Sequence, residues 1–250
     1  MCILFILRKK NSKWPLLIAT NRDEFYNRNF LSPGTHWRRY PFIFAGKDKK
    51  AGGSWLGVNK HGLCVSILNR ESKIKPQHKL LSRGNLVINA LKNRKAEETK
   101  NNFLKCFQKK YHFFNLFIAD NSNAYWIKYD NFEIKVFSIP YGYSILDNFD
   151  LNDKNSLRQS LNKEIFYKSK HPRPDSDDFD DWSNLLTLSK QSLDEKQASI
   201  YVNKYKNNYG TVSSSIIGLP SSRVSSKNIF WLYRNSLSNQ PSFKKLKVFS

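Results

Sequence analysis

The sequence has few of the residues that define several classes of protein. Its 250 residues include 3 cysteines, and Cys2, Cys64 and Cys106 show no paired spacing. An odd, scattered set of this kind argues against a secreted fold held by disulfides and favours a reducing compartment. With 10 Gly and 9 Pro, the chain also has too little of either residue for a collagen-like or low-complexity protein.

Long apolar runs and metal-binding patterns are missing as well. The longest apolar runs, residues 3–7 and 15–19, are far shorter than the ~20 residues that cross a bilayer, and the first is too short for a signal peptide. The 5 histidines show no HxxxH spacing, and no CxxC pair accompanies them. The sequence therefore predicts a cytoplasmic protein without a transmembrane segment, a metal or a cofactor.

Acidic residues are scarce relative to basic ones. The 20 Asp and Glu against 42 Lys and Arg give a formal net charge of +22. Such a charge favours nucleic-acid binding, because neutralised phosphates release counterions. The basic residues are scattered along the chain, however, and no zinc finger, homeodomain or RNP-type motif accompanies them. We therefore favour a solvated basic surface that suits an anionic ligand over a nucleic-acid interface, which stays as an alternative.

Hydrophobic periodicity predicts alternating groups of strands and helices. Strands are predicted at residues 2–7, 16–20, 54–58, 63–68, 113–120, 124–129, 133–139, 212–219 and 228–233, with apolar–polar alternation from 243 to 249. Helices are predicted at residues 82–91, 97–111, 155–168 and 180–188, with a loop at 171–181. The order favours an α+β layered fold, and without repeats or a linker it predicts one domain of residues 1–250.

Cys2 is the cysteine whose place in the chain gives it a chemical argument. Removal of Met1 would leave it with a free α-amine, which titrates at about 7.7–8.0 and suits a general base for its own thiol. A hairpin of the predicted length would bring Asn21, Arg22 and Asp23 back to the chain start. Two simpler interpretations remain: a buried strand cysteine, and a charged turn in which Asp23 or Glu24 caps the next segment.

Several collinear motifs carry a resemblance to a known family. They are residues 21–24 (NRDE) with Met1–Cys2 upstream, 45–48 (AGKD), 51–58 (AGGSWLGV), 62–63 (GL), 82–84 (SRG), 114–116 (FNL) and 209–214 (YGTVSS). Together they resemble the NRDE family, also called the transport and Golgi organisation protein 2 family. That family is similar to the N-terminal-nucleophile (Ntn) hydrolases, in particular the cholylglycine hydrolase and penicillin V acylase branch.

The resemblance implies a fold, a reaction and a set of site residues. The fold is a four-layer αββα sandwich, and the reaction is hydrolysis of an amide or thioester through an acyl-cysteine. Cys2 is then the nucleophile, Asp23 and Arg22 hold the geometry, and Asn69 donates to the oxyanion. The predicted substrate-binding residues are Asn21, Trp55, Arg70 and Arg234.

The sequence also departs from the branch's pattern. Thr20 stands where the branch has an arginine, which leaves Arg22 on the same strand face as its replacement. Val212 replaces the motif arginine, and a second oxyanion asparagine is missing or displaced to Asn148.

The resulting hypothesis is an N-terminal cysteine hydrolase with a small, anionic or lipid-like substrate. The alternative is a non-catalytic binder or carrier of acyl lipid, acyl-CoA or haem that acts in membrane trafficking or Golgi organisation. A basic nucleic-acid-binding protein is the second alternative.

Overall fold

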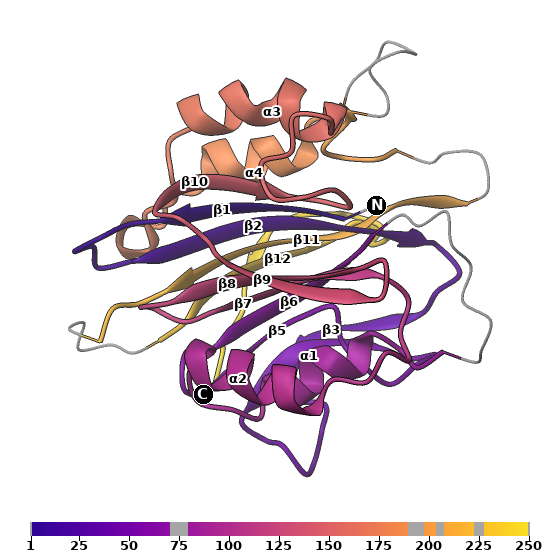
Figure 1. The fold of residues 1–250 in the computed structure, drawn as a ribbon. Coiled ribbons are helices and arrows are strands. Elements are labelled where there is room, and N and C mark those ends of the chain that lie inside the picture. Colours follow the sequence, from indigo (N-terminus) through magenta and orange to yellow (C-terminus); the bar gives the residue numbers. More distant parts are fainter. Residues whose placement is uncertain (1, 71–79, 190–197, 204–207, 223–227, 250) are drawn as a thin grey trace. The chain divides into compact units, whose positions relative to one another are not determined.

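The chain divides into two compact units, each with its own sheet and helices (Figure 1). The computed structural model describes residues 2–70, 80–189, 198–203, 208–222 and 228–249. The first unit contains residues 1–27 and 141–247, and the second contains residues 28–140 and 248–250. The single domain predicted across residues 1–250 stays a prediction.

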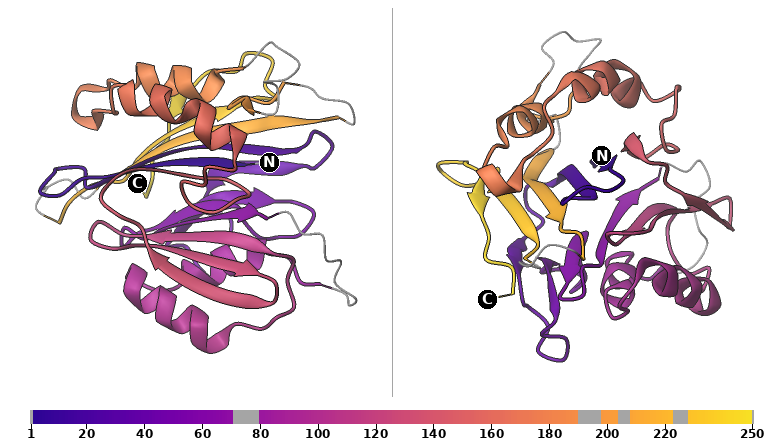
Figure 2. Two further views of the ribbon diagram at one scale, coloured as in Figure 1. Left: turned by 45° about the horizontal axis from the view of Figure 1, so that its top comes forward. Right: turned by 90° about the vertical axis from the view of Figure 1, so that its left-hand side faces the viewer.

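The first unit is built on an antiparallel sheet with the strand order β10-β1-β2-β11-β12-β13. Its strands are β1 (Ile3–Arg8), β2 (Leu16–Phe25), β10 (Gly142–Leu146), β11 (Tyr209–Leu219), β12 (Phe230–Asn235) and β13 (Lys244–Lys245). Two α-helices, α3 (Leu157–Lys168) and α4 (Asp180–Thr187), lie over one face of this sheet, with the short 3₁₀ helix η1 (Pro174–Ser176) between them in sequence (Figure 2).

Alternate residues of the central strands form the core beneath these helices. Ile3 and Phe5 of β1 are fully buried and belong to one cluster with Phe166 and Trp182. The ring of Phe166 lies 4.8 Å from Phe5 and 5.4 Å from Trp182 between centroids, so the three side chains pack as one aromatic group. The period of two along β1 therefore fixes which side chains contact the helices.

The second unit contains another antiparallel sheet, in which the strands follow chain order from β3 to β9. They are β3 (Phe30–Gly34), β4 (Ile43–Asp48), β5 (Leu56–Asn59), β6 (Cys64–Asn69), β7 (Phe114–Ala119), β8 (Ala124–Asp130) and β9 (Glu133–Ser138). The helices α1 (Gly84–Ala90) and α2 (Ala96–Cys106) cover one face of it (Figure 1). Buried Val87, Leu91 and Ala96 pack there against Val65 and Ile118.

Two glycines explain part of the motif at residues 51–58. A Cβ on Gly53 would lie 2.4 Å from the carbonyl carbon of Gly84, a contact that real Cβ atoms do not make. The backbone N–H of the next residue, Ser54, donates to Gly84 O at 3.1 Å. The motif glycine thus permits the backbone before β5 to touch the start of α1.

The structure confirms the α+β class, with two antiparallel sheets and helices on a face of each. It extends the strand predicted at 16–20 to Phe25 and adds β3, β4 and β10, for which no strand was predicted. The helix predicted to reach residue 111 ends at Cys106, because Phe107 turns extended and the chain continues to a bridge between Tyr111 and Leu81. From residues 243 to 249, only Lys244–Lys245 form a strand.

Across the described residues, no helix is long and apolar enough to cross a membrane.

Candidate active site

The pairing of β1 with β2 brings the NRDE segment to the start of the chain. Ile3 is paired with Asn21, so Cys2 comes next to Arg22 and Asp23. The Cys2 thiol is partly buried and donates to the backbone carbonyl of Asp23 over 3.9 Å. On its other side β2 pairs with β11, where Asp23 is opposite Thr211, Arg22 is opposite Ser213, and the register shifts between these two pairs. The predicted hairpin thus places Cys2 at the centre of a group of polar residues.

The carboxylate of Asp23 is held by two side chains from distant parts of the sequence. Arg158 in the first turn of α3 donates from Nη2 to Oδ2 at 3.0 Å, and Thr211 donates from Oγ1 to Oδ1 at 2.6 Å. The Asp23 side chain is 0% exposed and that of Arg158 is 8% exposed. Arg158 also donates to Ile200 O at 2.8 Å. A buried carboxylate with this pairing has a fixed position and orientation.

The backbone carbonyl of Asp23 accepts a second hydrogen bond, from Tyr209. The Tyr209 hydroxyl lies 3.2 Å from this oxygen, which Cys2 also contacts. Burial raises the pKa of Tyr209 well above its ordinary value, and the negative charges that Cys2 carries as a thiolate and Asp23 as a carboxylate raise it further. Tyr209 is therefore a neutral hydrogen-bond donor at neutral pH.

Arg22 provides positive charge beside the thiol. Its side chain is 6% exposed and its Nη2 lies 3.7 Å from Oε2 of Glu24. Burial raises the pKa of the Cys2 thiol above its ordinary value, and Asp23 raises it further. The charge of the N-terminal amine, the hydrogen bond to Asp23 O and the charge of Arg22 lower the thiol pKa without reversing the net rise. Cys2 is thus held mainly as the thiol, which needs a base before it can act as a nucleophile.

Asn21 has structural contacts in this arrangement. Its amide nitrogen donates to Leu186 O at 2.8 Å and to Ile200 O at 2.9 Å, and the residue is 0% exposed. These bonds tie β2 to the end of α4 and to the segment that also receives Arg158. They favour a positioning role, and the substrate contact predicted for Asn21 stays untested.

Arg234 lies on β12, opposite Ser214 of β11. Its guanidinium is 5.2 Å from the ring centroid of Tyr201, and Nη1 donates to Ser236 Oγ at 3.3 Å. Its predicted contact with substrate stays a prediction.

The other predicted site residues belong to the second unit. Arg70 is largely buried, with Nη2 3.1 Å from Asp130 Oδ2 and Nη1 donating to Asn115 Oδ1 at 3.0 Å. Trp55 packs edge-to-face on Phe30. Asn69, which ends β6, is exposed. Their predicted parts in a site around Cys2 therefore stay predictions.

Sequence reasoning missed the three side chains that hold Asp23 in place. Tyr209 and Thr211 fall within the motif at residues 209–214, which identified the segment without giving either residue a role. Arg158 had a weaker signal. It is followed at helical spacing by Asn162, and both residues are buried on the face of α3 that packs in the first unit. A pair of polar residues at such spacing indicates that a helix face supplies hydrogen-bond donors to its neighbours.

Solved structures define the class of fold. The chain is similar to a conjugated bile acid hydrolase mutant from Clostridium perfringens, with a TM-score of 0.54, 12% identity and coverage of 98% of this chain and 92% of that one. It is also similar to a Caenorhabditis elegans N-acylethanolamine-hydrolyzing acid amidase ortholog, with a TM-score of 0.59, 12% identity and coverage of 90% and 96%. The fold is that of the Ntn hydrolases.

The family follows from the sequence match. A model of the family Transport and Golgi organisation 2 matches residues 1–226, and the chain belongs to this family. The human Transport and Golgi organization protein 2 homolog is 32% identical over 137 residues, which are 50% of this chain and 47% of that protein. The mouse homolog is 38% identical over 77 residues, 28% of this chain and 27% of that protein. The matched part of this chain thus spans less than half of the length of these curated relatives.

Proposed function

We propose that this chain is an N-terminal cysteine hydrolase that cleaves an amide or thioester through an acyl-enzyme on Cys2. The α-amine of a processed Cys2 takes the thiol proton as Sγ bonds to the carbonyl carbon. The bond to the leaving nitrogen or sulfur then breaks, and the ammonium returns the proton to that leaving group. Water then hydrolyses the thioester, with the same amine as base.

The observation that carries this proposal is the fixed geometry around Cys2. Its thiol contacts Asp23 O, and the Asp23 carboxylate is held by Arg158 and Thr211. A residue locked on both side-chain oxygens and on its carbonyl positions its neighbours more firmly than a solvated turn does. The Ntn-hydrolase fold and the family membership support the same reaction class.

The raised pKa of the thiol makes a local base necessary. With its nitrogen in a peptide bond Cys2 has no such base, whereas a free α-amine has an ordinary pKa of about 7.7–8.0 and accepts a proton near neutral pH. The proposal therefore requires that processing leave Cys2 as the first residue. A chain that retains a residue before Cys2 is expected to fold and to lack activity.

Acylation by p-nitrophenyl acetate, followed by peptide mass spectrometry, tests the proposal. Cys2 should be acetylated in the processed chain. A variant with glycine inserted between Met1 and Cys2 should react at least about 100-fold more slowly, because it has lost its general base. Exposed Cys106 supplies an internal reference in both proteins, and buried Cys64 should stay unmodified. The Cys2→Ala variant should show no adduct at that position and should hydrolyse no substrate.

Two outcomes would overturn the proposal. One is an intact Met1 on the purified protein together with full hydrolytic activity. The other is equal acetylation of Cys2 with and without the inserted glycine, since the α-amine would then have no part in the reaction.

The substrate that suits this site is a small amide or thioester of anionic or lipid-like character, and we propose that the protein meets it in the cytoplasm. The positive charge of Arg22 beside the thiol and the net charge of +22 favour an anionic acyl or leaving group.

A further inference from the structure

A separate pocket lies within the second unit, between α1 and α2. Its volume is about 540 Å³. Pockets for small molecules typically have volumes of about 300–1,000 Å³ and combine an apolar wall with a few polar groups. Its lining residues, among those that the structure describes, fall between Leu86 and Tyr111 in one short stretch of chain.

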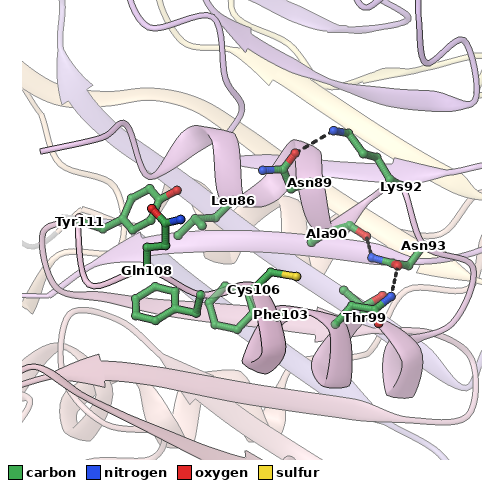
Figure 3. Close-up of a pocket in the computed structure, with 12 residues that line it drawn as sticks. Leu86, Asn89, Ala90, Lys92, Asn93, Thr99, Phe103, Cys106, Gln108 and Tyr111 are labelled. Carbon is green, nitrogen blue, oxygen red and sulfur yellow. Dashed lines mark hydrogen bonds between the residues drawn. The ribbon is translucent and has the colours of Figure 1, made fainter.

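One end of the pocket is aromatic. The rings of Phe103 and Phe107 stack with their centroids 5.2 Å apart, and those of Phe107 and Tyr111 stack at 5.8 Å. Leu86 of α1 faces this row (Figure 3). Stacked rings that line a cavity favour a flat apolar guest, since a further ring gains offset or edge contacts in addition to the burial of its area.

The opposite end is polar and carries a positive charge. Figure 3 shows Lys92, Asn93 and Thr99 there, away from Tyr111 and Gln108. Lys92 Nζ donates to Asn89 Oδ1 at 2.8 Å, a neutral acceptor, and lies 4.5 Å from the ring centroid of Tyr40. Among the described lining residues there is no Asp or Glu, so no carboxylate of the pocket wall neutralises the ammonium.

Hydrogen bonds fix the polar end before any ligand binds. Buried Asn59, the last residue of β5, donates from Nδ2 to Leu91 O at 2.9 Å and to Asn93 O at 2.6 Å. The Asn93 side chain donates to Ala90 O at 3.0 Å and accepts from Asn102 at 2.7 Å. A wall that is already ordered loses little entropy on binding.

We propose that this pocket binds an aromatic carboxylate, with the ring system against Phe103 and Phe107 and the carboxylate toward Lys92. The aromatic row supplies a surface for the ring, and the ammonium of Lys92 is the cation of the lining at the polar end. A cationic ligand would meet repulsion there and find no carboxylate among the described residues of the wall. This binding does not depend on Cys2 or on the proposed hydrolysis.

Anthracene-2-carboxylate is the probe for this site, with binding measured by isothermal titration calorimetry on the full chain. The Lys92→Met variant should bind it about 10-fold more weakly, since one charge-assisted hydrogen bond contributes roughly this factor. The neutral anthracene-2-carboxamide should bind both proteins with affinities that differ by less than about twofold, because it lacks the charge. Lys105→Met, on α2 outside the lining, is the matched control and should leave carboxylate binding unchanged.

Cys106 locates the binding. Its side chain lines the pocket, and Figure 3 shows its sulfur between the aromatic and polar ends. Saturating probe should slow alkylation of Cys106 by iodoacetamide, and Cys106→Phe should fill the space and abolish binding of both probes while the exposed position lets the chain fold. The proposal is wrong if the carboxylate does not bind at millimolar concentration, if the carboxamide binds as tightly as the carboxylate, or if Cys106→Phe has no effect.

Discussion

Loss of the Arg158 guanidinium should destabilise the first unit by about 3–5 kcal/mol, the range measured when one partner of a buried ion pair is removed. The structure places this pair at the buried extreme, with the Asp23 side chain 0% exposed and that of Arg158 8% exposed. Arg158→Met keeps most of the side-chain length and removes the donors to Asp23 Oδ2 and to Ile200 O. The carboxylate then keeps Thr211 as its neutral donor and loses its adjacent positive charge.

The partner substitution separates pairing from packing. Asp23→Asn alone leaves Arg158 buried beside a neutral amide, and the double variant Asp23→Asn/Arg158→Met leaves neither charge. If the two residues stabilise each other, the double variant should lose less than the sum of the single variants, by about 1–3 kcal/mol. With an m-value of about 3 kcal/mol/M in urea, a loss of 3 kcal/mol lowers the midpoint by about 1 M.

The change in the urea midpoint of the first unit can be measured by peptide-resolved hydrogen exchange, which monitors the amides of β2 and β11 as the urea concentration rises. Lys168→Met is the matched control on the same helix. The side chains of Lys168 and Glu164 are 80% and 83% exposed, so the loss of their ion pair should leave the midpoint unchanged. An Arg158→Met midpoint equal to that of the control, or strictly additive effects in the double variant, would refute the reasoning.

Three further changes have defined outcomes. Tyr209→Phe removes a hydrogen bond to a backbone carbonyl and should lower the urea midpoint by the equivalent of about 1 kcal/mol, with the fold unchanged by circular dichroism. Burial raises the pKa of Asp48, but hydrogen bonds from Arg28 and from the backbone outweigh it and leave the pKa below its ordinary value. The stability that Asp48 contributes to the second unit is therefore present above about pH 4 and lost as the pH falls through its folded pKa, and Asp48→Asn should flatten the acid side of a midpoint-against-pH curve. Gly53→Ala should lower the free energy of unfolding, measured in urea, by about 1–3 kcal/mol or more, because the added Cβ meets the Gly84 backbone. A urea midpoint equal to that of the wild type would contradict this prediction.

The elements that could be predicted from sequence are those whose pattern is complete within a short stretch. β1, β7 and β8 are short and mostly apolar, and a short apolar run of this kind indicates a buried strand from the sequence alone. β10 escaped prediction because its five residues, Gly142–Leu146, form a strand only through pairing with β1, where Leu4 is opposite Leu146. β2 was predicted too short for a related reason. Its polar end is buried and forms a strand because β11 pairs with it as far as Phe25.

Of the site, the sequence could supply the hairpin and the residues that it carries. The number of residues between Cys2 and Asp23 indicates the length of the hairpin. In the structure Cys2 Sγ lies 3.9 Å from Asp23 O. Arg158, which is 135 residues from Asp23, could not be found this way, because no local pattern encodes a contact of that separation. The two units also divide the predicted site residues, so the parts of Asn69 and Arg70 depend on more than local pattern.

In α3, buried hydrogen-bond donors face the core, while a row of apolar side chains at helical spacing is left partly exposed. Its apolar residues Leu157, Leu161 and Ile165 recur at helical spacing, yet they are 55%, 45% and 40% exposed. Burying them fully would gain about 2–4 kcal/mol in total, half of the ~1.5–3 kcal/mol for each complete side chain. Turning the helix would remove Arg158 from Asp23, which costs about 3–5 kcal/mol, and Asn162 from Ala198 O, which costs about 1–3 kcal/mol more. The buried donors, together with fully buried Phe166, therefore determine which face of α3 packs in the first unit, and the apolar stripe on the adjoining face stays exposed.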